Sequence, residues 1–252
     1  MESNNKTIII ISAIILSLGF VGAGFNIGKG FRRMARTVTV KGLAEQDVRS
    51  DLGIFEINYR ELGNDLVQLD QKILHDQQLA TEFLKQQGFN DNEIYRSQLR
   101  IEDRLANTYN QTNESTTQPR YVVTGGIILR SKNVDVIDKT TQLTDKLLLQ
   151  GVPLTFDASS LSPNPSYYFT QLDSIRPAML ATATKSAYSI ANQFAEDSGV
   201  RLGGIQRASQ GVFQIMGRDT STMSSNWSSD QNALGSIDKK VRLVTTIDYR
   251  LK

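Results

Sequence analysis

The sequence predicts an α+β protein in which an antiparallel sheet packs against about three helices, preceded by one N-terminal transmembrane helix. Three patterns support this prediction: an uncharged apolar run over residues 7–28, three later segments with apolar residues at helical spacing, and alternation of apolar and polar residues over 241–251. Helical spacing indicates helices that bury one apolar face. The alternation is typical of an antiparallel sheet with one solvated face.

The N-terminal apolar run is long enough to span a bilayer. Its centre, residues 8–21, is dominated by isoleucine and leucine. A membrane helix needs about 20 mainly apolar residues, whereas the apolar stretch of a cleaved signal peptide has about 7–15. We therefore predict a short tail at 1–6, an uncleaved signal-anchor helix at 7–28, a basic linker at 29–36 and a folded α+β domain at 37–252.

The charges that flank this segment favour a cytoplasmic location for the folded domain. Lys6 is the basic side chain that precedes the segment, whereas four follow it closely: Lys29, Arg32, Arg33 and Arg36. The side of a membrane helix that carries more lysine and arginine usually faces the cytoplasm. Read alone, the charge pattern therefore argues against a periplasmic domain.

Within the apolar segment, Gly24 and Gly28 form a pair of small residues separated by three positions. Such a pair lets two membrane helices approach closely, so it is a candidate helix–helix contact. Glycine is also common in membrane helices in general, and that explanation is the simpler one.

Charge and cysteine content exclude several classes of function. The formal net charge is +2, with acidic and basic residues interspersed, and the chain contains no cysteine. Proteins that bind nucleic acids usually carry a basic face, so we expect no nucleic-acid partner. The absence of cysteine excludes disulfides, thiolate metal sites and cysteine nucleophiles.

Along the folded domain, strands and helices alternate. We predict strands at about 37–41, 52–59, 94–103, 121–130, 152–156, 205–213 and 241–251, and helices at about 65–87, 134–149 and 173–197. The first helix is expected to begin at a cap formed by Asn64 or Asp65 and to end at Gly88. Pro177 is placed near the first turn of the third helix, where proline is tolerated. The predicted buried stripe of the first helix consists of Leu62, Leu66, Leu69, Ile73, Ala80 and Phe83.

No motif in the sequence predicts catalysis, a cofactor or a metal ion. His75 is the single histidine, and without partner ligands it is expected at the surface or its boundary. Asp103 is expected to cap a strand end or to form a salt bridge. The Ser236-x-x-Lys239 spacing matches the serine–lysine pattern of penicillin-recognising enzymes by length alone, because the other motifs of that set are absent. We therefore expect a protein without enzymatic activity, and a hydrolase is the weakest of the functions considered.

Two long polar segments, 106–118 and 217–236, are candidate interaction loops. The second contains Met223 and Trp227, the single tryptophan of the chain. Tryptophan is enriched in binding hot spots, so Trp227 could anchor a partner. It could equally fold back onto the domain, and the sequence does not separate these alternatives. A small-molecule or peptide binding module that uses the two loops is the alternative function.

Several segments resemble the SIMPL domain family. These are Val38-Thr-Val-Lys-Gly-Leu-Ala-Glu45 followed by Asp51, Arg120-Tyr-Val-Val, Arg130-Ser-Lys-Asn-Val-Asp135, and the alanine-rich stretch that ends Ala195-Glu-Asp-Ser-Gly-Val-Arg-Leu-Gly203. The resemblance covers about residues 36–252 and consists of strand, turn and helix patterns, without catalytic signatures. Gly63-Asn-Asp-Leu66 and Phe83-Leu-x-x-x-Gly88-Phe89 resemble a membrane-anchored bacterial branch of the family, as does Ser50, where the general family often has proline.

The resemblance implies an envelope protein whose biochemical role is unassigned. Family members are typically periplasmic, some assemble into large oligomers, and some are linked to tolerance of oxidative stress. It therefore implies a single-pass protein of the bacterial inner membrane with a periplasmic domain, which acts as a homo-oligomeric scaffold or assembly module. This implication opposes the one drawn from the flanking charges.

Overall fold

The computed structural model of the protein describes residues 36–106, 119–155, 164–218 and 233–252. Within these ranges, no helix has the length and apolar character needed to cross a membrane. The predicted transmembrane helix with Gly24 and Gly28 lies outside the described residues, as do Met223 and Trp227. The described chain divides into two compact units. Unit 1 comprises residues up to Ala44 together with Leu180–Val212 and Val244–Lys252, and unit 2 comprises Glu45–Met179 and Phe213–Leu243.

The α+β class is confirmed, but the predicted single sheet is wrong. The strands form two sheets, one with the order β1-β9-β8 and a larger one built around β2 and β5. The described chain contains four α-helices and one short 3₁₀ helix, η1 (Asp91–Glu93), in place of about three helices.

The larger sheet, in unit 2, is centred on a long antiparallel pair. Strand β2 (Leu52–Gly63) pairs with β5 (Tyr121–Ser131) in a register that sets Gly53 opposite Ser131 and Gly63 opposite Tyr121. Two short strands extend the β5 side: β3 (Ile94–Arg96) and β4 (Arg100–Asp103). Two others extend the β2 side: β6 (Leu154–Thr155) and β7 (Ser166–Tyr168), the last of which the sequence did not predict.

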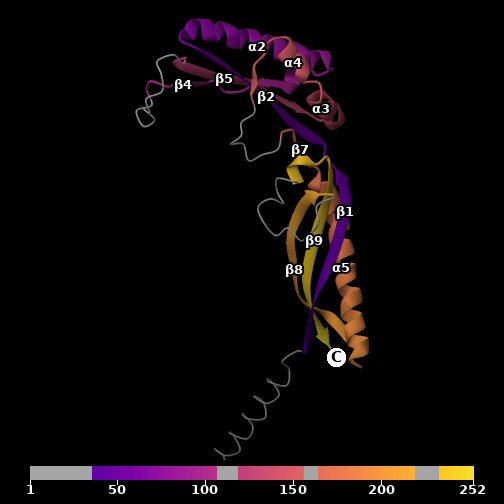
Figure 1. The fold of residues 1–252 in the computed structure, drawn as a ribbon. Coiled ribbons are helices and arrows are strands. Elements are labelled where there is room, and N and C mark those ends of the chain that lie inside the picture. The colour runs from indigo at the N-terminus through magenta and orange to yellow at the C-terminus, as the bar shows by residue number, and fades with distance from the viewer. Residues whose placement is uncertain (1–35, 107–118, 156–163, 219–232) are drawn as a thin grey trace, which may run out of the picture. The chain divides into compact units, whose positions relative to one another are not determined.

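Helix α2 (Leu66–Gln86) lies along β2 and β5, as Figure 1 shows. Its predicted cap is confirmed, because the Asp65 carboxylate accepts hydrogen bonds from the backbone N–H groups of Val67 and Gln68. Gly88, with φ at +96°, follows the helix in the left-handed conformation that glycine adopts without strain. The buried stripe begins later than predicted, since Leu62 and Leu66 remain 42% and 41% exposed.

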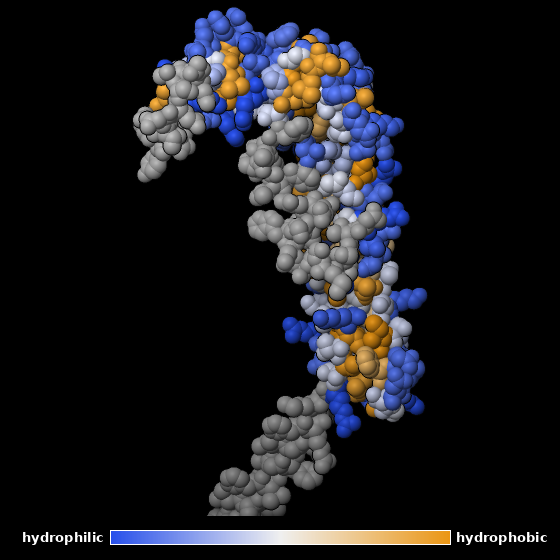
Figure 2. Space-filling model, in the orientation of Figure 1, coloured by the Kyte–Doolittle hydropathy of each residue, from blue (hydrophilic) through white to orange (hydrophobic). Residues whose placement is uncertain are grey.

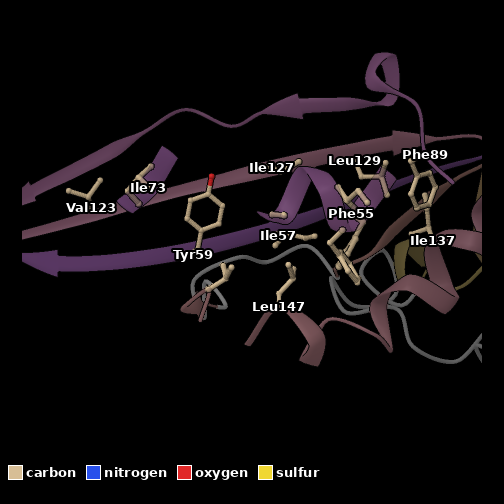
Figure 3. Close-up of a cluster of buried hydrophobic side chains, with 14 of the residues drawn as sticks. Phe55, Ile57, Tyr59, Ile73, Phe89, Val123, Ile127, Leu129, Ile137 and Leu147 are labelled. Atoms are coloured by element: carbon tan, nitrogen blue, oxygen red, sulfur yellow. The ribbon is translucent and has the colours of Figure 1, made fainter. Parts of the chain in front are cut away.

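The predicted helix at 134–149 is two helices, α3 (Val134–Thr141) and α4 (Asp145–Leu149). Threonine hydroxyls at the break donate to backbone carbonyls: Thr141 to Asp138 and Thr144 to Thr141. Such local bonds compete with continued helical hydrogen bonding, which accounts for the interruption. Figure 3 shows the core that α2, α3 and α4 close over the sheet, with Phe55, Ile57 and Tyr59 in a row on β2.

Unit 1 is formed by parts of β1 (Thr37–Arg49), β8 (Leu202–Gly217), β9 (Asp238–Leu251) and helix α5 (Leu172–Asp197). The first strand extends well past the predicted 37–41, and β8 extends past 205–213. Pro177 lies inside α5, near the start of the helix as predicted.

Alanine lets α5 pack closely on β1 and β9. Its fully buried face consists of Ala183, Ala187, Ala191 and Ala195. Ala187 and Ala191 pack with Val40 of β1 and with Ile247 and Tyr249 of β9. The predicted alternation of β9 is confirmed, because its buried residues recur at every second position. Figure 1 shows α5 running along these strands.

Candidate functional site

Asp76 is a carboxylate within the apolar stripe of α2. The buried residues of the helix are Leu69, Ile73, Asp76, Ala80, Phe83 and Leu84. Asp76 is only 4% exposed. Its Oδ2 atom is buried and has no hydrogen-bond partner among the residues that the structure describes. Burying a carboxylate oxygen without a donor is costly, so this position needs an explanation other than core packing.

The carboxylate lines an open pocket of about 620 Å³ in unit 2. Helix α2 contributes most of the wall, β2 contributes Glu61, and Gly151, which follows α4 in the sequence, is also part of the lining. The α2 residues follow helical spacing and share one face of the helix: Gln68, Gln71, Lys72, His75 and Asp76. Lys72 Nζ lies 3.5 Å from Glu61 Oε2. One of the two acids therefore has a cationic neighbour at contact distance.

The electrostatics of the pocket are dominated by Asp76. The pKa of Asp76 is raised to about 6, chiefly by burial and also by the negative charge of Glu61, while His75 and Lys72 act in the opposite direction. Burial also raises the pKa of Tyr59, to about 12, with a contribution from Asp76 and an opposing one from Arg96. Because the pKa of Asp76 lies just below neutral pH, the carboxyl group is largely ionised in a neutral medium while remaining desolvated.

His75 is exposed at the edge of this pocket, which confirms the surface location expected from the sequence. No group of three or more histidine, cysteine or acidic side chains in the described ranges could hold a metal ion. The pocket therefore has acids and a histidine in one place without the convergent ligand set that a metal requires.

Asp103 forms the salt bridge that was one of its two expected roles. Arg120 Nε lies 3.0 Å from Asp103 Oδ1, and its Nη2 lies 2.8 Å from Oδ2. These hydrogen bonds lower the pKa of Asp103 and raise that of Arg120. The pair links the end of β4 to the residue that precedes β5.

Ser236 and Lys239 do not form a catalytic pair. Lys239 Nζ donates to the backbone carbonyls of Ala233 and Ser236, while the Ser236 hydroxyl donates to the carbonyl of Asp238. The two side chains are therefore not hydrogen-bonded to each other. Burial lowers the pKa of Lys239 to about 8, and the residue is only 2% exposed. The interpretation of this spacing as accidental is in keeping with the structure.

A second feature, in unit 1, is the free edge of β8. The strand lies at one end of the β1-β9-β8 sheet, so in the described chain its outer backbone groups face no other strand. Every residue from Gly204 to Val212 is exposed. Ile205 and Val212 are 53% and 83% exposed, and Arg207 is the single charged side chain in the strand.

The same unit exposes apolar side chains on α5, namely Tyr188, Ile190 and Phe194. Figure 2 shows apolar surface over the part of unit 1 where α5 and β9 end. Among the residues that the structure describes, unit 1 therefore combines a strand edge without a neighbouring strand with exposed apolar side chains.

These features describe a two-sheet α+β domain with a polar pocket and a free strand edge. A comparison with protein-family models matches residues 38–242 to SIMPL, described as a protein of unknown function (DUF541). Because the match covers most of the chain, the protein belongs to the SIMPL family, as the sequence resemblance predicted. No curated protein matches the chain.

Sequence reasoning missed Asp76, although the signal was present. Positions 69, 73, 76, 80 and 83 advance by four, three, four and three residues, so one face of the helix contains all of them. An acidic residue in such a stripe is a buried charge or a functional group. The predicted stripe passed over position 76 because it counted apolar residues alone.

Proposed function

We propose that this SIMPL-family protein is a non-enzymatic scaffold of the bacterial envelope, anchored in the inner membrane by residues 7–28, with a periplasmic domain that assembles with further copies of the same chain. The family membership and the uncharged apolar segment support the envelope location. A role in stress tolerance accompanies this proposal on the family resemblance alone.

The free edge of β8 is the observation that supports assembly. A long, exposed edge strand offers a row of unpaired N–H and C=O groups, and natural proteins block such edges with proline, several charges or short length. Strand β8 has 16 residues, no proline and one charged side chain. In unit 1 its exposed residues are small, polar or apolar, so a second strand meets no charge barrier there except Arg207.

A second copy of this chain is the occupant that the edge fits. The partner strand is either β8 of the other copy, which gives a symmetric pair, or β1, the opposite end of the same sheet. Pairing of β8 with β1 repeats head to tail and closes into rings or continues as filaments. Both arrangements give Ile205 and Val212, which are exposed in the described chain, cross-strand neighbours.

Single cysteines test the assembly cleanly, because the chain has none of its own. We expect Ser209→Cys on β8 to form a disulfide-linked dimer if β8 pairs with itself. If β8 pairs with β1, Ser209→Cys should cross-link to Lys41→Cys in a mixture of the two variants. Lys139→Cys, on the exposed surface of α3, is the control that should not cross-link. A particle that is monomeric in mild detergent, with no cross-link at either position, would overturn the scaffold proposal.

Charge on the edge provides an independent test. Val212→Lys should weaken self-association by about tenfold or more, because pairing of the edge would remove water from the lysine ammonium group. Val67→Lys is the matched control, because Val67 is 68% exposed on α2 and belongs to unit 2. Equal effects of the two substitutions would exclude β8 as the assembly surface.

The location requires its own experiment. A reporter fused after Lys252 that is active only outside the cytoplasm should be active in intact cells. An inactive reporter with normal expression would support the orientation that the flanking charges favour and would reject the periplasmic domain.

A further inference from the structure

In the described part of the protein, the buried carboxylate of Asp76 lacks a hydrogen-bond donor for one of its oxygens. Asp76 is among the residues that line the pocket. Its Oδ2 atom is buried and accepts no hydrogen bond among the described residues. A carboxylate in that state is stabilised by a positive charge that approaches it from the pocket. The ligand that best stabilises this carboxylate is one that carries an N–H donor and is small enough to enter the open pocket.

The charges around the pocket select a cation over a neutral donor. Glu61 lies close enough to Asp76 to raise the pKa of that carboxyl group by like-charge repulsion. Lys72 stands 3.5 Å from Glu61, and its side chain is 59% exposed, so solvent screens it. A positive ligand in the pocket that both acids line relieves this repulsion, whereas a neutral donor does not.

The other residues that line the pocket favour an organic cation over a metal ion. No metal-binding group of three acidic or histidine side chains exists in the part of the chain described, so a divalent ion lacks its ligand set here. The wall includes Gln68 and Gln71, whose amide oxygens accept hydrogen bonds. An ammonium group has three donors and no acceptor, which suits the carboxylate and amide oxygens that line the pocket together with Lys72 and His75.

We propose that this pocket binds an organic ammonium ion of the linear polyamine class, with Asp76 as the buried counter-charge and Glu61 as the second. The pocket volume of about 620 Å³ accommodates more than a single ammonium group. Nothing in this proposal depends on assembly through β8, because every residue that lines the pocket belongs to unit 2.

The test is titration calorimetry of the full chain in mild detergent with spermidine as the probe. Saturable binding is expected, and Asp76→Asn should weaken it at least tenfold, because the substitution keeps the shape and removes the charge. Glu61→Gln should weaken it less. Asp70→Asn is the control: it removes the same charge from an exposed position of α2 that does not line the pocket, and it should leave the affinity unchanged.

Lys72→Met supplies a change in the opposite direction. The lysine ammonium competes with the ligand for Glu61, so its removal should tighten spermidine binding severalfold. A substitution that merely disturbed the pocket would weaken binding instead. Tightening in Lys72→Met together with weakening in Asp76→Asn would therefore identify charge pairing as the cause.

The proton release that accompanies spermidine binding distinguishes a charge-pairing role of Asp76 from a purely structural one. Since the pKa of Asp76 is about 6, spermidine binding at pH 6 should release a fraction of a proton from the wild-type protein, measured as a heat difference between two buffers. Tyr59, Glu61, Lys72 and His75 also face this group or line the pocket, so a His75→Gln variant serves as the comparison. Loss of the proton release in Asp76→Asn, with retention in His75→Gln, would assign it to Asp76.

Three results would overturn the proposal. The first is the absence of saturable spermidine binding. The second is equal weakening by Asp76→Asn and Asp70→Asn, which would indicate attraction to the general surface charge. The third is equally tight binding of a neutral diol of similar length, which would show that the positive charge of the ligand is not recognised.

Discussion

Gly42 of β1 and Ala183 of α5 approach each other so closely that a Cβ atom at position 42 would lie 1.9 Å from the carbonyl oxygen of Ala183. The same Cβ would lie 2.8 Å from the Cβ of Ala187. The obstacle is helix backbone and a short side chain, neither of which has a flexible end that could move aside. Glycine at position 42 and alanine along α5 therefore set the distance between the helix and the sheet in unit 1.

Gly42→Ala is expected to destabilise unit 1 strongly. Overpacking a close contact costs typically 1–3 kcal/mol, and more when backbone must move. We expect a loss of about 3 kcal/mol in the free energy of unfolding, measured by urea denaturation followed by circular dichroism. Gly204→Ala is the matched control, because no atom lies within 4 Å of the added Cβ. A loss below about 1 kcal/mol for Gly42→Ala would contradict the close approach.

Asp76→Asn should stabilise the protein at neutral pH. The pKa of Asp76 is raised from 3.8 to about 6, so the folded state binds a proton more tightly than the unfolded state. Stability from this group is therefore greatest below pH 4 and is lost as the pH rises toward 6, at a cost on the order of 3 kcal/mol. The asparagine variant should be more stable than wild type at pH 7.5 by on the order of 1–3 kcal/mol.

The difference between the two proteins should shrink toward pH 4, where the wild-type carboxyl group is protonated when folded. Denaturant unfolding at pH 4, 5.5 and 7.5 measures the trend. An asparagine variant that is less stable than wild type at pH 7.5 would show that the carboxylate has a partner that compensates its burial.

Much of the fold was predictable from local signals. The cap at Asp65, the glycine after α2, the alanine-rich helix and the alternation of β9 each depend on chemistry that a few neighbouring residues determine. The division into two sheets was not predictable in this way, because strand pairing joins residues far apart in sequence, such as Gly53 and Ser131. Short strands such as β7 have too few residues for a pattern.

The predictions for individual side chains failed where the facing element decides burial. Leu62 occupies the opposite parity to Tyr59 on β2, so it points to the other face of that strand. Asp76 was passed over because its identity is polar although its position is apolar. The pocket could not be predicted at all, since Glu61 and Asp76 meet only after β2 and α2 pack together.

The ion pair between Asp103 and Arg120 should stabilise unit 2 in a cooperative way. Two guanidinium nitrogens donate to the carboxylate, and the backbone N–H of Arg120 also donates to the side chain of Asn64, at 2.8 Å. Asp103→Asn and Arg120→Gln should each lower the melting temperature, and the double variant should lower it by less than the sum. Additive effects would mean that the two side chains do not stabilise each other.

This contribution should also depend on pH. Because hydrogen bonds from Arg120 lower the pKa of Asp103, the stabilisation is present above the carboxyl group's ordinary pKa of 3.8 and is lost as the pH falls through its lower folded value. The pair Asp173 and Arg176 provides a comparison, since Asp173 is 91% exposed and their contact is a single one of 3.1 Å. Its double-mutant cycle should show little coupling.

The free energy of unfolding should increase as the pH rises above 8, because the buried Lys239 then loses its positive charge. Burial lowers the pKa of this amine from 10.5 to about 8, so between these values the unfolded chain binds more protons than the folded one and stability increases with pH. Below pH 8 the buried cation costs on the order of 3 kcal/mol. Lys239→Met should remove this pH dependence, although it also loses the hydrogen bonds to the carbonyls of Ala233 and Ser236.

The measurement is the free energy of unfolding of both proteins at pH 7.5, 8.5 and 9.5. Tyr59 titrates above this range, because its pKa is raised to about 12. The difference between wild type and Lys239→Met should grow in favour of wild type at each step. A constant difference across the three values would mean that Lys239 titrates as an exposed lysine does, and that the carbonyls around it accept a full positive charge without penalty.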